Sequence, residues 1–258
     1  DNANNPPSSP FSKGGLEGDF DKGGMGGFSE GKIAEFQNQV KDKPVAERIA
    51  FWAEQFVGTP YDTDPLGEYV TKKVIAADER VDCMYHVFRT AELALSNTPA
   101  EAQEKALDLR FHSKGIMKDN MVTNYDDRFQ DGIDMILSGK WGKDITEELG
   151  KTIDVEGSKA LGKQKTLLKD SAIKAAEKLK SGDIIFFIKD PKRRVAGEIV
   201  GHMGIIKRGG NNIYLIHASG KKGETPPQNQ FDKWEVKKVS LVDYLRFMRF
   251  IGIKVTRF

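Results

Sequence analysis

The chain has 258 residues but only one cysteine, Cys83, and this limits the chemistry that its side chains can perform. A single cysteine can form neither a disulfide within the chain nor a multi-cysteine metal site. Cys83 follows Asp82 and begins a stretch with helical periodicity, in which Val87, Ala91 and Leu95 share one face. Because a helix N-terminus presents free N–H groups and a positive dipole end, we expect this thiol to have a lowered pKa and to act as a nucleophile. The alternative is a small buried apolar residue.

A thiol nucleophile needs a general base, and the base needs an orienting group. The histidines of the chain are His86, His112, His202 and His217. His202 lies in one β-rich run and His217 ends the next, and Gly209-Gly210-Asn211-Asn212 joins the two runs as a hairpin turn. Two adjacent antiparallel strands can place both imidazoles side by side on one face, against which the start of the Cys83 helix can pack. We therefore predict Cys83 as the nucleophile, His202 as the base and His217 as the orienting group.

The other two histidines are assigned to the wall of the substrate site, with a structural role as the alternative. His86 lies one turn after Cys83 on the same predicted helix, a spacing at which it could also pair with the thiol. His112 follows Arg110-Phe111. Cys83, His86, His202 and His217 together have the ligand types of a zinc site, which is the less favoured reading. We predict no metal and no cofactor.

The order of predicted elements indicates an α+β fold. Residues 32–56 predict two helices that divide near Pro44, and Thr98-Pro99-Ala100-Glu101 predicts a helix start with Thr98 as its N-cap. Further helices are predicted at about 126–137 and over the lysine-rich residues 158–180, with the lysines on a solvated face. After Gly182 the pattern predicts strands at 183–188, 200–207 and 213–217, a helix at 240–250 and a strand at 251–257. Helices followed by adjacent strands favour an antiparallel sheet.

The composition predicts a flexible segment followed by one domain. Residues 1–30 are rich in Asn, Pro, Ser and Gly and are expected to be a flexible N-terminal segment. Residues 31–258 are expected to form a single catalytic domain with a helical insertion around 111–180. Since the chain begins at Asp1 and not at Met, we expect that an export signal has been removed.

Charge and hydropathy exclude several classes of protein. The apolar fraction of 38% is enough for a core, but no run of about 18 apolar residues predicts a transmembrane segment. Lys and Arg (40) nearly balance Asp and Glu (38), and a net charge of +2 gives no general case for nucleic acid as a partner. The glycines of residues 23–27 lack the lysine and the flanking strand of a phosphate-binding loop.

An ordered set of short motifs resembles the NlpC/P60 cysteine peptidases. The motifs are Gly58-Thr59-Pro60-Tyr61, Asp82-Cys83, Ser181-Gly182-Asp183-Ile184-Ile185-Phe186-Phe187, Gly201-His202-Met203-Gly204-Ile205 and Ile216-His217-Ala218. More narrowly, the chain is similar to the N-acetylmuramoyl-L-alanine amidase-like branch known as domain of unknown function 1460. The segments that resemble this branch are Arg110-Phe111-His112, residues 125–128, His217-Ala218-Ser219 and residues 252–257. The resemblance covers about residues 43–258.

The resemblance implies a papain-like NlpC/P60 fold, in which a helix bearing the cysteine packs on a small antiparallel sheet bearing the histidines. It implies hydrolysis of an amide bond in the peptide part of peptidoglycan through a thioester on Cys83, with the Cys83 backbone N–H holding the oxyanion. Tyr61 matches a tyrosine that lines the family's substrate site. Asp82 matches an aspartate that helps to hold a substrate's free amine in members that cut after D-glutamate. Met84 stands where those members usually have Ser or Thr, which slightly favours the amidase.

We therefore expect a peptidoglycan hydrolase that cleaves the N-acetylmuramoyl-L-alanine bond. The alternatives are a γ-D-glutamyl endopeptidase of the stem peptide, a transferase, and a non-catalytic wall-binding relative on the same fold. The resemblance implies a protein exported to the periplasm or cell envelope, with peptidoglycan or a muropeptide as its partner. We expect it to be a monomer.

Overall fold

The structure is a computed structural model that describes residues 27–157, 161–195, 197–229 and 232–258. Most of its helices lie in the first half of the chain. The α-helices are α1 (Glu30–Val40), α2 (Val45–Gln55), α3 (Glu68–Thr71), α4 (Cys83–Ala94), α5 (Pro99–Leu109), α6 (Gly132–Ser138), α7 (Thr146–Leu149), α8 (Lys169–Ala175) and α9 (Leu241–Phe247). Short 3-10 helices are η1 (Tyr125–Asp127), η2 (Ala176–Lys178) and η3 (Pro191–Arg193).

The second half of the chain supplies most of an antiparallel sheet, with the order β4-β5-β10-β6-β7-β8-β9 and β3 paired to β10. A separate small pair is formed by β1 and β2. The strands are β1 (Met117–Lys118), β2 (Met121–Val122), β3 (Lys143–Asp144), β4 (Ile153–Val155), β5 (Gln164–Leu168), β6 (Ile184–Ile188), β7 (Val200–Gly209), β8 (Asn212–Ser219), β9 (Glu235–Ser240) and β10 (Gly252–Arg257). The predicted α+β class with an antiparallel sheet is confirmed.

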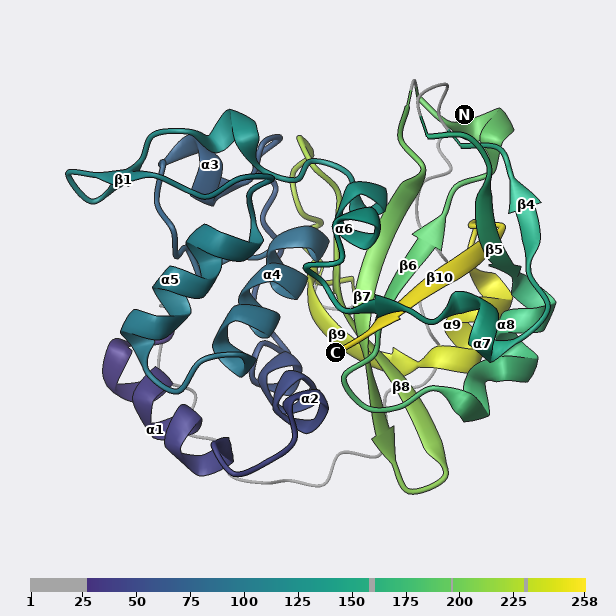
Figure 1. The fold of residues 1–258 in the computed structure, drawn as a ribbon, viewed down its shortest axis with the longest axis horizontal. Coiled ribbons are helices and arrows are strands. Elements are labelled where there is room, and N and C mark those ends of the chain that lie inside the picture. Colours follow the sequence, from purple (N-terminus) through teal and green to yellow (C-terminus); the bar gives the residue numbers. More distant parts are fainter. Residues whose placement is uncertain (1–26, 158–160, 196, 230–231) are drawn as a thin grey trace.

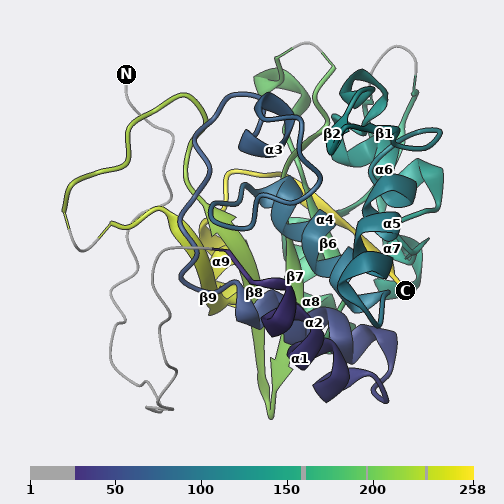
Figure 2. The ribbon, with the colours of Figure 1, turned by 90° about the vertical axis from the view of Figure 1, so that its left-hand side faces the viewer.

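The sheet separates two layers of helices. Helices α1, α2, α4 and α5 gather on one side of the molecule, and α2 and α4 contact β7 (Figures 1 and 2). Helices α8 and α9 contact each other on the opposite face (Figure 1). Alternate side chains of a strand therefore enter different cores. On β7, Met203 and Ile205 enter the core beneath α4, whereas Ile206 enters the core beneath α8 and α9.

Local signals predicted several helices and the central strands, but the prediction also contains errors. Thr98 caps α5 as predicted, because its side chain accepts a hydrogen bond from the backbone N–H of Glu101. The single helix predicted over 158–180 is wrong. Strand β5 precedes α8 there, and its residues Thr166 and Leu167 are buried between neighbouring strands. The pattern also missed β9, an edge strand with two adjacent lysines.

The folded domain begins slightly earlier than predicted. Most of the segment predicted to be flexible, residues 1–26, lies outside the described residues. The Phe28 ring, however, packs edge-on against Trp52 and Phe56, and Ser29 caps α1. Residues 28–30 therefore belong to the domain. In the described part of the chain, no helix combines the length and the apolar character needed to cross a membrane.

Candidate active site

The nucleophile predicted from the sequence is the first residue of α4. The Asp82 side chain caps this helix by accepting a hydrogen bond of 2.7 Å from the backbone N–H of Tyr85. Cys83 is half-buried as a residue, and the backbone of Met203 hydrogen-bonds to its thiol. The start of α4 therefore lies against β7, one residue beyond His202.

The two histidines on the neighbouring strands form a hydrogen-bonded pair. His202 Nε2 lies 2.8 Å from His217 Nδ1, and the two rings are nearly perpendicular. Strands β7 and β8 pair from Gly209–Asn212 at the turn to Ile205–Ile216. One residue further in the same register, Gly204 lies opposite His217. A Cβ atom on Gly204 would lie 3.1 Å from the His217 Cβ and 2.7 Å from a backbone oxygen. Glycine at this position therefore allows His217 to lie beside His202.

The imidazoles contact Tyr244 of α9 and also lie within electrostatic reach of His86 on α4. His202 stacks on Phe187 and Phe250, and these two rings belong to the core layer that α9 covers. The Cys83 side chain belongs to the other layer. The β7–β8 pairing ends at Ile205–Ile216, so His202 lies beyond the paired part of these two strands, although it still pairs with Phe187 of β6.

Tyr244 of α9 is a site residue that the sequence analysis missed. Its ring lies 5.0 Å from the His217 ring, edge to face, and stacks on His202 at 6.2 Å. Burial, followed by the nearby Cys83, raises the pKa of Tyr244, which keeps its hydroxyl protonated. No motif marks this tyrosine, because only the packing of α9 on β8 brings it to the histidines.

The electrostatics of the site differ from the sequence prediction. Burial and then the neighbouring Asp82 carboxylate raise the pKa of Cys83 to about 12, although hydrogen bonds from the backbone oppose the rise. Burial lowers the pKa of His202 to about 4 and that of His217 well below its usual value. The lowered thiol pKa predicted from the helix N-terminus is therefore wrong for the resting site. Thiol and imidazoles are neutral at pH 7.

We expect this neutral resting state to show in the pH dependence of alkylation. Only the thiolate reacts with iodoacetamide, and its fraction rises about tenfold per pH unit below the pKa. The rate for Cys83 should therefore keep rising from pH 7 to pH 10 in the folded protein. In urea, the same cysteine should level off above about pH 9, as a free thiol does. A rate in the folded protein that is constant between pH 5 and 8 would instead indicate a thiolate–imidazolium pair.

Two of the residues predicted to contact substrate, Tyr61 and Asp82, lie near Cys83. Tyr61 lies in a loop, directly before Asp62, and forms an isolated β-bridge with Val81. The Tyr61 backbone N–H donates a hydrogen bond to the Trp234 carbonyl. Burial raises the pKa of the Tyr61 phenol, and Cys83 and Asp82 raise it further, so the phenol is protonated. The influence of Cys83 indicates that the phenol lies near the thiol. Lys222 joins the same group through an ion pair of 2.7 Å with Asp82. The sequence analysis did not select Lys222, because it lies in a loop without a motif.

The other two histidines differ in burial. His86 is fully buried, and its ring packs edge-on against Phe56. Burial lowers its pKa to about 4, so His86 is a neutral core residue and does not fit the predicted contact with substrate. His112 is exposed, and its ring lies 4.3 Å from Phe129. Among the described residues, no three His, Cys, Asp or Glu side chains are arranged to hold a metal ion.

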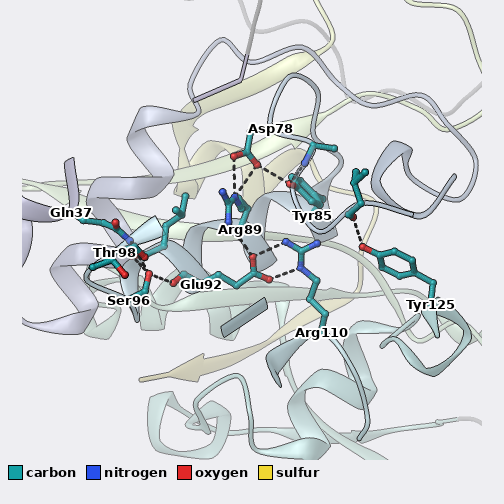
Figure 3. A network of polar contacts seen from close by, with 12 residues as sticks. Gln37, Asp78, Tyr85, Arg89, Glu92, Ser96, Thr98, Arg110 and Tyr125 are labelled. Carbon is teal, nitrogen blue, oxygen red and sulfur yellow. Dashed lines mark hydrogen bonds and ion pairs between the residues drawn. The ribbon is translucent and has the colours of Figure 1, made fainter. Parts of the chain in front are cut away.

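Buried ion pairs hold helix α4, which begins with Cys83 (Figure 3). Asp78 accepts hydrogen bonds from the Tyr85 hydroxyl at 2.7 Å and from Arg89 Nε at 2.9 Å. One turn further along α4, Glu92 pairs with Arg110 from the end of α5, and both side chains are fully buried. The network joins α4 to two loops of the chain, and its charges compensate one another away from solvent.

Comparison with known proteins finds solved structures with a similar fold. No family model and no curated protein matches the sequence. An N-acetylmuramoyl-L-alanine amidase from Bacteroides uniformis is 20% identical, with a TM-score of 0.63, covering 83% of this chain and 98% of that chain. A Legionella pneumophila protein of domain of unknown function 1460 is 18% identical, with a TM-score of 0.64, covering 88% and 93%. A putative xylanase from Bacteroides fragilis is 20% identical, with a TM-score of 0.59, covering 81% and 100%. The chain shares the fold of these proteins.

Proposed function

We propose that the protein is a peptidoglycan hydrolase that cleaves the amide between N-acetylmuramic acid and L-alanine. Cys83 is the nucleophile, His202 the base and His217 the orienting group. The observation that carries the proposal is the 2.8 Å hydrogen bond between the two imidazoles. Cys83, the first residue of α4, raises the pKa of Tyr244, whose ring contacts both imidazoles. The fold shared with a structure described as an N-acetylmuramoyl-L-alanine amidase supports the choice of substrate.

The first half of the reaction forms a thioester. His202 uses Nε2 to bond His217, so its Nδ1 is the nitrogen that accepts the Cys83 proton. Sulfur attacks the carbonyl carbon of the lactyl group, and the carbonyl oxygen becomes an oxyanion that accepts the Cys83 backbone N–H. The C–N bond then breaks, and the alanine nitrogen leaves with the proton from His202.

The second half regenerates the enzyme. A water molecule gives its proton to His202 and attacks the thioester carbon, and the C–S bond breaks. The acid product leaves and the proton returns to sulfur. Burial lowers the pKa of His202 to about 4, so the ring is neutral at pH 7 before the thiol proton is transferred. Tyr244 and Phe250 position the ring by stacking on it.

Digestion of purified peptidoglycan tests the function directly. We expect mass spectrometry to find free stem peptides that begin with L-alanine, together with glycan strands whose lactyl groups end in a carboxylate. Fragments cut after D-glutamate would indicate the endopeptidase instead. If an active-site thiol probe labels Cys83 but no muropeptide is cut, the proposed substrate is wrong.

A further inference from the structure

Three aromatic rings stack on the imidazole of His202. Measured between ring centres, Phe187 lies 5.7 Å away at an interplanar angle of 27°, Tyr244 lies 6.2 Å away at 29°, and Phe250 lies 6.3 Å away at 8°. The ring of Phe187 also lies 5.0 Å from that of Tyr244 and 5.5 Å from that of Phe250, so the rings support one another. We call these three rings the aromatic wall.

The fold brings the aromatic wall together from three segments. Phe187 of β6 is the register partner of His202 on β7, and antiparallel partners point to the same face of a sheet. Tyr244 comes from α9. Phe250 precedes β10, and a Cβ on Gly201 would lie 2.7 Å from its ring. Glycine directly before His202 therefore lets the Phe250 ring approach the imidazole.

In the described part of the chain, no carboxylate acts on the imidazole pair to balance a positive charge. In a Ser-His-Asp triad, the aspartate stabilises the imidazolium that forms during the reaction. Here the proposed orienting group, His217, is itself an imidazole. Burial lowers the pKa of His202 and so disfavours its charged form. The titratable groups that face the pair come from three elements and are Cys83 and His86 of α4, Tyr244 of α9 and Lys237 of β9.

We propose that the aromatic wall stabilises the imidazolium that His202 forms when it accepts the proton of Cys83. The face of an aromatic ring carries partial negative charge and attracts a cation that stacks on it. A neutral imidazole lacks this attraction, so the wall favours the charged intermediate over the neutral resting state. The three rings thus act through His202 as positioning residues and take over part of the role of a negatively charged orienting group. The inference rests on the proposed function, in which His202 is the base.

A fluorinated series at position 250 tests the proposal, because fluorine withdraws negative charge from the face of a ring and changes its size little. The full chain carries phenylalanine, 4-fluorophenylalanine or 3,4,5-trifluorophenylalanine in place of Phe250, and Cys83→Ala removes the thiol. Nuclear magnetic resonance of nitrogen-labelled histidine follows the first protonation of the imidazole pair between about pH 7 and pH 3. The pKa of this step should fall with the number of fluorines, by about half a unit to one unit for the trifluoro ring.

The same series at position 247 is the matched control. Phe247 is 64% exposed on α9 and does not belong to the aromatic wall, so fluorine there should leave the pKa of the pair unchanged. If the fluorinated chains do not fold, Phe250→Leu replaces them with Phe247→Leu as its control, and only Phe250→Leu should lower the pKa. A pKa that does not depend on the number of fluorines at position 250 would mean that the ring only fills space, and would overturn the proposal.

Kinetics separate this proposal from the proposed function. In the chain with intact Cys83, kcat for muropeptides should fall with the number of fluorines at position 250, and KM should stay constant, because the wall acts on the charged intermediate and not on substrate binding. If the pKa falls as expected but no muropeptide is cut, the proposed function fails and the effect of the aromatic wall on His202 stands.

Discussion

Replacing Cys83 with alanine is expected to lower kcat/KM for muropeptide cleavage by at least about 10⁴-fold, because no other group in the site can form the thioester. His202→Ala should have a comparable effect, and the double variant should be no worse than either single variant, since the two groups act as a unit. His217→Ala should cost less, roughly 10²-fold, because it removes only the group that orients the base. Each effect is measured as the rate at which stem peptide is released from muropeptides, and chromatography follows this release.

Stability measurements must accompany these kinetics. Cys83→Ala should change the free energy of unfolding by no more than about 1 kcal/mol, since the small side chain of a half-buried residue is trimmed. His112→Ala serves as the histidine control, because this exposed ring contacts Phe129 away from the imidazole pair. A rise in the KM for muropeptides in the His112→Ala protein would support the prediction from the sequence that His112 lines the substrate site. Full activity of Cys83→Ala would rule out the thioester mechanism.

Breaking the buried ion pair between Glu92 and Arg110 is expected to have the largest effect on stability. Glu92→Leu should lower the free energy of unfolding by about 3–5 kcal/mol, because it leaves the Arg110 charge uncompensated in the core. The Arg110 guanidinium also lies 4.9 Å from the centre of the Tyr85 ring, so its displacement should disturb the start of α4. Urea unfolding followed by the fluorescence of the buried Trp52 and Trp141 measures the loss.

Two controls separate a charge effect from a packing effect. In the double variant Glu92→Leu/Arg110→Met, no charge of the pair remains, so much of the lost stability should return. The exposed pair between Lys143 and Glu148, at 2.7 Å, is the surface control, and Glu148→Leu should change stability little. If Glu92→Leu cost no more than Glu148→Leu, the network would not be what holds α4 in place.

The sequence by itself determined the order of the elements and the residue types of the site. Ser29, Asp82 and Thr98 cap helices, and each acts within three residues of itself along the chain. The alternation of β7 and β8 and the turn between them brought His202 and His217 together for the same local reason. The error at β5 came from this dependence too, since a five-residue run with one exposed lysine, Lys165, also suits a helix.

Only the tertiary structure decided which groups surround the thiol and how they are charged. Lys222 reaches Asp62 across 160 residues of sequence, and Tyr244 reaches His202 through the packing of α9 on the sheet. The helix N-terminus predicted a reactive thiolate, but burial raises the pKa of Cys83 to about 12. The physical reason is that periodicity and caps depend on neighbours along the chain. Desolvation and charge pairing depend on distant segments that the fold brings together.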